Sequence, residues 1–184
     1  KATVRDRLLH HAIYRVLYPH FNKTFIADSY SCRNNKGTHR AMNRFCEFAY
    51  RASRNHTRTS WILKCDIRKF FASVDHEVLM DILRTRILDE NTLRLLGEIV
   101  GSFSSTEKSS VLAGSGTSFR KGGTGLPLGN LTSQLLVNIY MNEFNQFVKH
   151  TLRAKHYIRY ADDFVVLSPN RMWLEIVLPE VESF

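Results

Sequence analysis

Two adjacent aspartates, Asp162 and Asp163, lie between short apolar runs in the segment 156–167. The pattern predicts a strand, a tight turn and a second strand, with both carboxylates at the tip of the hairpin. Adjacent like charges beside buried strands repel each other unless a cation holds them. Mg²⁺ is the natural candidate because it binds carboxylate and phosphate oxygens together, so this segment points toward phosphoryl transfer.

A third carboxylate, Asp66, lies near the end of a predicted strand over residues 60–67. Alternation along this strand places Lys64 and Asp66 on one face and Leu63 and Cys65 on the other. The three carboxylates can converge only if their strands are neighbours in one sheet. Such a cluster suits two divalent metal ions a few ångströms apart, as in nucleotidyl transfer. Taken singly, an aspartate is more often a cap, a turn or a salt-bridge residue.

Helices are predicted around these strands by apolar residues at helical spacing and by capping residues. The segments are 5–21, 38–54, 75–88, 90–102 and 131–150, and the chain ends at Phe184 inside the pattern of another helix. Thr38 is the expected N-cap of the second helix, after a polar loop over 22–37. Residues 103–125, rich in Ser, Gly and Thr, are expected to form a loop or a weak hairpin.

Two of these helices carry polar stripes. The helix over 38–54 presents basic side chains on one face, while apolar side chains gather elsewhere on its wheel. This basic stripe consists of Arg40, Arg44, Arg51 and Arg54. An ordinary solvated face is the alternative, although residues 33–58 contain seven Lys or Arg and only Glu47 in opposition. The helix over 131–150 carries amides at four-residue spacing, which are Gln134, Asn138 and Asn142.

The composition favours a nucleic-acid partner. The chain has 184 residues, 43% of them hydrophobic, and a net charge of +9 with a pI near 9.7. This balance indicates a polyanionic partner, with a merely basic enzyme or a ribosome-associated domain as alternatives. Three cysteines without a Cys-x-x-Cys pair argue against zinc and fit a cytoplasmic protein. No apolar run approaches the ~20 residues of a membrane span, and the start at Lys1 indicates a piece of a longer protein.

Four segments resemble the motifs of reverse transcriptases, in the order of that family. Residues 28–40 are similar to the fingers motif that supplies triphosphate-binding cations. Residues 66–76 resemble the first catalytic motif, an aspartate followed after four residues by an aromatic. Residues 126–134 resemble the glycine-containing second motif, and Tyr160-Ala-Asp-Asp163 matches the Tyr-x-Asp-Asp box. The resemblance covers nearly the whole chain.

The resemblance implies an α+β fold with an antiparallel palm sheet that has helices on one face, including 75–88 and 131–150. Residues 1–60 would form mainly fingers and residues 61–184 mainly palm. Nothing resembles a thumb, and the chain is expected to be truncated at both ends. The implied partners are an RNA template, a DNA or RNA primer and deoxynucleoside triphosphates, while an accessory protein is left open. No membrane is expected, and the implied location is the prokaryotic cytoplasm.

Metal ligands follow from the same resemblance. Asp66 and Asp162 would be the principal ligands, and Asp163 would be the second carboxylate of the box. The backbone carbonyl of Ile67 would add a ligand. The metal would be a pair of Mg²⁺ ions, with Mn²⁺ as a substitute.

Nucleotide contacts are implied for a further set of residues. Arg33, together with Lys36 or Arg40, would clamp the triphosphate. Phe71 matches the aromatic residue that excludes a ribose 2′-hydroxyl, and Phe70 beside it would pack in the core. The remaining implied contacts to the nucleotide are Lys64, Leu128, Gly129 and Gln134.

Primer and template contacts are implied for three residues. Tyr160 would lie beside the primer end. Arg44 and Arg51, within the basic stripe, would contact template phosphates without reading sequence.

One departure bears on the subclass. Many reverse transcriptases have Gln-Gly-x-x-x-Ser-Pro where this chain has Leu128-Gly-Asn-Leu-Thr-Ser-Gln134. This pattern is similar to that of diversity-generating retroelement enzymes, which copy an RNA template with frequent errors at adenines. Leu128 cannot hydrogen-bond near the nascent base pair as Gln would, and a lost polar constraint loosens discrimination. Group II intron-like, retron and defence-associated enzymes stay open as alternatives, because lineage drift would also explain these residues.

Two other functions compete with reverse transcription. A viral-type RNA-dependent RNA polymerase also uses paired aspartates, but Phe71 argues against it because the ring would exclude ribonucleotides. A catalytically silent, maturase-like RNA-binding module would have no need of the complete set Asp66, Asp162 and Asp163.

Overall fold

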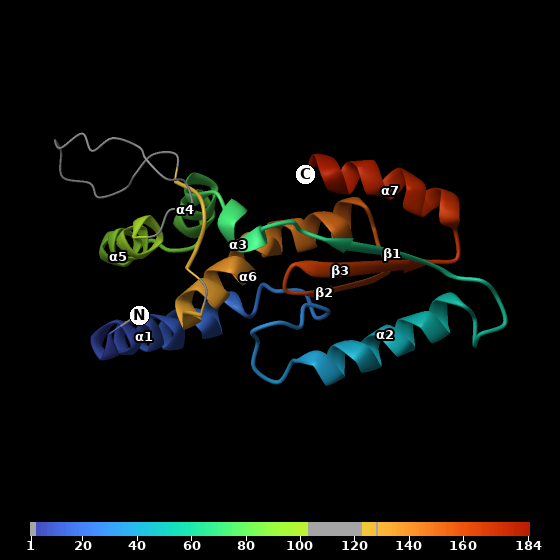
Figure 1. The fold of residues 1–184 in the computed structure, drawn as a ribbon, viewed down its shortest axis with the longest axis horizontal. Coiled ribbons are helices and arrows are strands. Elements are labelled where there is room, and N and C mark those ends of the chain that lie inside the picture. The colour runs from blue at the N-terminus through green and yellow to red at the C-terminus, as the bar shows by residue number, and fades with distance from the viewer. Residues whose placement is uncertain (1–2, 103–122, 128) are drawn as a thin grey trace. The chain divides into compact units, whose positions relative to one another are not determined.

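A computed structural model describes residues 3–102, 123–127 and 129–184. The described chain combines helices with a small antiparallel sheet, which confirms the α+β class. It packs as two units, whose positions relative to one another are not determined (Figure 1). The first unit is Lys1–Tyr18 with Lys69–Tyr140, and the second unit is Pro19–Arg68 with Met141–Phe184. The packing units do not test the expected division into fingers over residues 1–60 and palm over residues 61–184. That division stays a prediction.

The first unit is helical. It contains most of α1 (Val4–Phe21), α3 (Phe70–Ser73), α4 (His76–Arg84), α5 (Glu90–Gly101) and the first part of α6 (Leu131–Gln146). Asp75 caps α4 by accepting from the backbone N–H groups of Glu77 and Val78 at 2.8 and 3.0 Å. Asp89 caps α5 in the same way, through the N–H of Thr92 at 2.7 Å. These caps explain why both helices begin where the sequence predicts.

The second unit contains the sheet. Its strands are β1 (Trp61–Asp66), β2 (His156–Tyr160) and β3 (Asp163–Ser168), in the order β1-β3-β2 with both pairs antiparallel. The register places Asp66 opposite Asp163 and Tyr160 opposite Asp163. The predicted strand over 60–67 and the predicted hairpin are therefore both confirmed, and β3 brings them together.

Helices cover both faces of this sheet (Figure 1). On one face, α2 (Thr38–Ala52) packs through Phe48 against Ile158 and Leu167. On the other face, the end of α6 contributes the ring of Phe144, whose centroid lies 5.1 Å from that of Phe164. The π-helix η1 (Phe147–Thr151) continues α6, and α7 (Arg171–Ser183) packs against β1 and β3. Because side chains alternate along a strand, those of Asp66 and Asp163 point to the face that α2 covers.

Several details differ from the sequence prediction. Thr38 is the first residue of α2 and not its N-cap; Gly37 holds that position with φ 125°, in the region that favours glycine. The helix ends at Ala52, so Arg54 lies beyond it. The short helix α3 was not predicted. Asn138 and Asn142 of the amide stripe are buried. The expected loop over 103–125 lies mostly outside the described residues.

Among the described residues, no helix has both the length and the apolar character needed to cross a membrane.

Candidate active site

The β2–β3 hairpin turns within two residues, Ala161 and Asp162. Ala161 has φ 55°, a left-handed conformation that costs an L-residue about 1–2 kcal/mol. Asp162 follows it in the turn, and Asp163 begins β3. The turn therefore presents two consecutive carboxylates at the end of two paired strands, as the sequence predicts.

The carboxylates of Asp66, Asp162 and Asp163 form a cluster that we call the carboxylate triad. Each residue offers an oxygen atom, and these three atoms lie within 4.8 Å of one another. Asp66 is exposed and the other two are half-buried. Among the described residues, Lys64 forms an ion pair with the triad, its Nζ lying 3.7 Å from Asp163 Oδ1. Three negative charges thus face one lysine that is 70% exposed.

The triad fits a hard divalent cation. Its donors are all carboxylate oxygens, the atoms that Mg²⁺ and Mn²⁺ bind in proteins. The amide N–H of Ile67 donates to the carbonyl of Asp162 at 3.4 Å, which ties the end of β1 to the turn. The predicted role of the Ile67 carbonyl as a metal ligand stays a prediction, as do the catalytic roles of the three aspartates.

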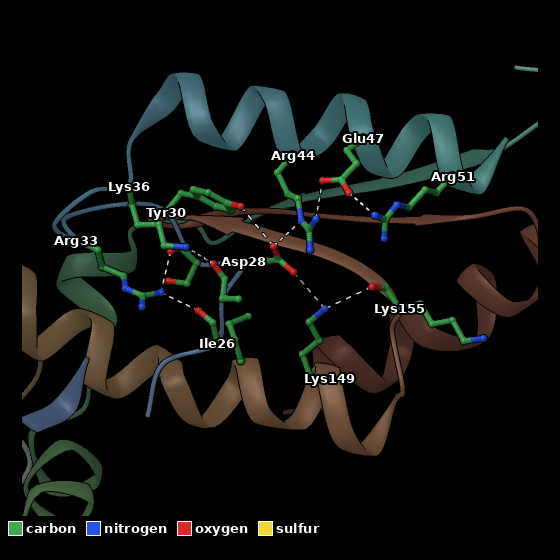
Figure 2. Close-up of polar contacts among 12 residues, drawn as sticks. Ile26, Asp28, Tyr30, Arg33, Lys36, Arg44, Glu47, Arg51, Lys149 and Lys155 are labelled. Atoms are coloured by element: carbon green, nitrogen blue, oxygen red, sulfur yellow. Dashed lines mark hydrogen bonds and ion pairs between the residues drawn. The ribbon is translucent and has the colours of Figure 1, made fainter. Parts of the chain in front are cut away.

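The cations expected to clamp a triphosphate contact their own loop, and Figure 2 shows Arg33 and Lys36 in these contacts. Arg33 donates to the carbonyls of Ile26 and Ser29 at 2.7 and 2.9 Å. Lys36 donates to the carbonyl of Ala27 at 2.6 Å, and burial, with Arg33 nearby, lowers the pKa of its ammonium group. Arg40 is exposed and donates to the carbonyl of Asn35. These contacts order the loop, and the triphosphate contact stays a prediction.

A second group of charges surrounds a buried acid, Asp28 (Figure 2). We call it the Asp28 cluster, and it comprises Asp28, Tyr30, Arg44, Glu47, Arg51 and Lys149. Asp28 lies 2.8 Å from Arg44 Nε and 3.6 Å from Lys149 Nζ, and it accepts from the hydroxyl of Tyr30 at 3.3 Å. Glu47 lies between Arg44 and Arg51, at 2.6 and 2.5 Å. Hydrogen bonds to Asp28 and Glu47 raise the pKa of Arg44.

The Asp28 cluster shows that the arginines of the basic stripe differ in their exposure and their partners. Arg44 is half-buried and bound to two acids, whereas Arg40 and Arg51 are exposed. Template contact by Arg44 and Arg51 stays a prediction. Sequence reasoning gave Asp28 no role, because its partners come from α2 and η1, far away along the chain.

Tyr160, the expected neighbour of the primer end, is partly exposed at the end of β2. Its hydroxyl lies 3.0 Å from the hydroxyl of Thr38, the first residue of α2. This contact joins the start of α2 to the strand end that carries the turn.

The other expected nucleotide contacts belong to the first unit. Phe70 is buried and Phe71 is half-buried, with their rings edge to face at 5.6 Å. The core role expected of Phe70 is therefore confirmed, and the role of Phe71 stays a prediction. Gly129 has φ 88°, a conformation that favours glycine. Gln134 is half-buried on α6, and Leu128 lies outside the described residues.

Sequence reasoning missed Arg159. This arginine is 1% exposed in β2, on the strand that leads into the turn. Its guanidinium contacts Asn145, which is also buried. The available signal was weak: a charged residue inside an apolar run, where burial requires acceptors that only the folded chain supplies.

The chain matches the family described as "Reverse transcriptase (RNA-dependent DNA polymerase)" over residues 2–184. It is 29% identical to the Escherichia coli protein YkfC over 145 residues, and 25% identical to the group II intron-encoded protein LtrA of Lactococcus lactis over 146 residues. Both matches cover 79% of this chain, but only 35% of YkfC and 22% of LtrA. The chain thus spans about a third or less of these relatives.

Solved structures agree on the fold. The chain is similar to apo telomerase from Candida tropicalis, with a TM-score of 0.59, 11% identity, and coverage of 92% of this chain and 35% of that one. A telomerase from Candida albicans, solved with a fragment of telomeric RNA, gives a TM-score of 0.51 at 13% identity, with coverage of 94% and 31%.

Proposed function

Because this chain belongs to the reverse transcriptase (RNA-dependent DNA polymerase) family, we propose that its carboxylate triad catalyses RNA-templated addition of deoxynucleotides to a primer 3′-end. The observation that carries this proposal is the approach of three carboxylate oxygens to within 4.8 Å of one another, from a strand and a turn that are far apart in sequence. A purely RNA-binding module has no need to concentrate negative charge in this way.

The triad would hold the metal ions. Asp66, Asp162 and Asp163 would supply carboxylate oxygens, and Ile67 would add its backbone carbonyl. When bound there, two Mg²⁺ ions would activate the primer hydroxyl as a nucleophile and neutralise charge on the leaving pyrophosphate. Lys64 would compensate part of the triad's charge before binding, since it already lies 3.7 Å from Asp163.

Residues outside the triad would select and orient the nucleotide. Phe71 would exclude a ribose 2′-hydroxyl by contact with the sugar, and Gly129 would allow the backbone to approach the incoming base. Arg33, Lys36 and Arg40 would neutralise the triphosphate after exchanging their present loop contacts for phosphate oxygens. Gln134 and Leu128 would line the position of the nascent base pair.

Primer and template would bind along the second unit. Tyr160 would contact the primer end, because it precedes the turn and is partly exposed. Arg51 and Arg40 of the basic stripe would contact template phosphates, and Arg44 would contribute from its position beside Asp28.

The reverse transcriptase subclass that we propose is based on the second motif, residues 126–134. Leu128 and Gln134 favour the error-prone enzyme of a diversity-generating retroelement. Similarity to the group II intron-encoded protein LtrA favours a group II intron-like enzyme as the second candidate. Copying a defined RNA and sequencing the product separates them: misincorporation concentrated at template adenines, and reduced by Leu128→Gln, is expected for the first subclass only.

Primer extension by the full-length protein tests the activity itself. We expect Mg²⁺-dependent DNA synthesis on an RNA template, lost in Asp162→Asn and on chelation. Asp81→Asn is the matched control, since Asp81 is an exposed aspartate paired with Arg84 on α4. Equal product from wild type and Asp162→Asn would rule out the proposed role of the triad.

A further inference from the structure

Arg159 is a buried cation in the strand that leads into the turn. Its side chain points to the face of the sheet opposite Asp163, because it pairs with Phe164 across the β2–β3 ladder. Its backbone is also bound on the outer edge of β2: its N–H donates to the carbonyl of Asp28, and its carbonyl accepts from Tyr30, both at 3.0 Å. The backbone of Arg159 is therefore held by the Asp28–Tyr30 segment as well as by the pairing of β2 with β3.

The guanidinium of Arg159 joins three separate segments. Nη1 donates to the carbonyl of Ala161 at 2.6 Å, within the turn itself. Nε donates to Asn145 Oδ1 on α6 at 3.1 Å, and Nη2 donates to the hydroxyl of Ser29 at 3.1 Å. The hydroxyl of Tyr157 donates to the same Asn145 oxygen at 2.8 Å. The turn is thus connected to a buried polar network.

These contacts act on a strained part of the backbone. Ala161 holds a left-handed φ of 55°, which persists only where the surroundings determine it. A charge-assisted hydrogen bond to its carbonyl is about twice as strong as a neutral one. Burial lowers the pKa of Arg159 to about 10, so the group stays charged at neutral pH. Burying such a cation is costly, and an apolar residue would pack there at lower cost.

We propose that Arg159 is a positioning residue for the carboxylate triad: by holding the Ala161 carbonyl, it fixes the direction in which Asp162 presents its carboxylate toward Asp66. This inference rests on the proposed function, because it assumes that the triad binds divalent metal. Groups that orient metal ligands from behind contribute about 10- to 100-fold in metal affinity or activity. Arg159 is expected to contribute in this range.

The test measures metal binding directly in the full-length protein, apart from catalysis. Mn²⁺ affinity is determined by electron paramagnetic resonance without substrates, and the Mg²⁺ dependence of primer extension is determined separately. We expect Arg159→Met to weaken Mn²⁺ binding and to raise the Mg²⁺ concentration for half-maximal rate by about tenfold or more. Arg159→Lys keeps the charge but lacks the planar fork, so we expect a smaller shift in the same direction.

Tyr157→Phe is the matched control. It removes a bond to Asn145 from the same buried network but keeps the contact between Arg159 and Ala161. We expect it to lower thermal stability and to leave the Mn²⁺ affinity unchanged. If Arg159→Met does not fold, Arg159→Lys decides the question.

The outcomes separate the two proposals. If folded Arg159 variants bind Mn²⁺ as tightly as wild type, Arg159 has only a structural role and the inference is overturned. If Tyr157→Phe weakens Mn²⁺ binding as much as Arg159→Lys does, the effect belongs to general destabilisation and the inference also fails. If wild type itself neither binds Mn²⁺ nor extends primers, the proposed function fails instead.

Discussion

The second unit contains two acidic sites, and the negative charge of each is balanced in a different way. Asp28 has a side chain that is 7% exposed, and the protein supplies its cations, Arg44 and Lys149. The carboxylate triad concentrates three acids at the end of the sheet, and among the described residues Lys64 is the cation that pairs with it. One site is neutralised within the protein, while the other keeps a surplus of negative charge.

This difference distinguishes an acid that stabilises the fold from the acids that we propose as metal ligands. A buried carboxylate without a partner would be very unfavourable, so Asp28 depends on its cations for the fold. Clustered carboxylates at a solvent-accessible edge repel one another at moderate cost, because water screens them. Their repulsion is relieved when a divalent cation binds. Substitutions at the two sites should therefore affect different properties, stability at one and activity at the other.

The largest expected effect is on activity at the triad. Asp66→Asn removes one ligand charge, and we expect primer extension to fall by about 10³-fold or more, because metal-based stabilisation amounts to several kcal/mol. The melting temperature should stay the same or rise, since one repulsive charge is lost. Single-turnover extension and calorimetry check both. A folded Asp66→Asn protein with wild-type rates would remove the distinction between the two sites.

The next effect is on stability at the Asp28 cluster. Asp28→Asn leaves Arg44 and Lys149 without their buried counter-charge, and we expect a loss of about 3 kcal/mol in the free energy of unfolding. Mn²⁺ affinity should be unchanged. Urea denaturation measures the loss, with Glu175→Gln as control because it breaks the exposed pair with Arg171 and should cost less than about 1 kcal/mol. Equal losses in both variants would contradict the structural role of Asp28.

The triad was predictable from sequence because local rules determined most of it. Alternation placed Asp66 at a strand end, and the Asp162-Asp163 pair between apolar runs indicated a hairpin tip. The family motifs supplied the remaining step, that β1 and β3 are neighbours. No local pattern contains the pairing of Asp66 with Asp163, since strand order depends on the whole sheet.

The Asp28 cluster and Arg159 were not predictable in this way. The partners of Asp28 lie on α2 and η1, and only the folded chain brings them together. An arginine in a strand is normally exposed, so the burial of Arg159 depends on acceptors supplied by other segments. The burial of Asn138 in the amide stripe also depends on an acceptor inside the protein, since its side-chain amide donates to the carbonyl of Gln134 at 3.1 Å.

A smaller effect is expected at Lys64, the one point where the triad resembles the Asp28 cluster. The side chains of Lys64 and Asp163 are 70% and 50% exposed, so their ion pair is weak, below about 1 kcal/mol. Lys64→Met should therefore tighten Mn²⁺ binding by about two- to fivefold, because a competing cation is removed. Arg171→Met, which breaks another exposed pair, is the control. Weaker Mn²⁺ binding in Lys64→Met would show that Lys64 supports the metal site.

The smallest effect concerns His156, whose titration is influenced by Lys149 and Arg51 of the Asp28 cluster. His156 packs on Phe48 with ring centroids 5.0 Å apart. Burial lowers the pKa of this imidazole below its usual 6.5, and Lys149 and Arg51 lower it further. The unfolded chain therefore binds the proton more tightly than the folded protein does. The neutral imidazole of His156 therefore contributes fully to the free energy of unfolding above about pH 6.5. This contribution is lost as the pH falls through the lower pKa of the folded state.

Replacing this imidazole tests the sign of that dependence. Between pH 7.5 and 5.5, the melting temperature of His156→Gln should fall by about 1–3 °C less than that of wild type, since the variant has no proton to take up there. His39→Gln, an exposed histidine on α2, should follow wild type. A steeper fall in His156→Gln would mean that acidic groups, and not Lys149 and Arg51, dominate the electrostatic surroundings of His156.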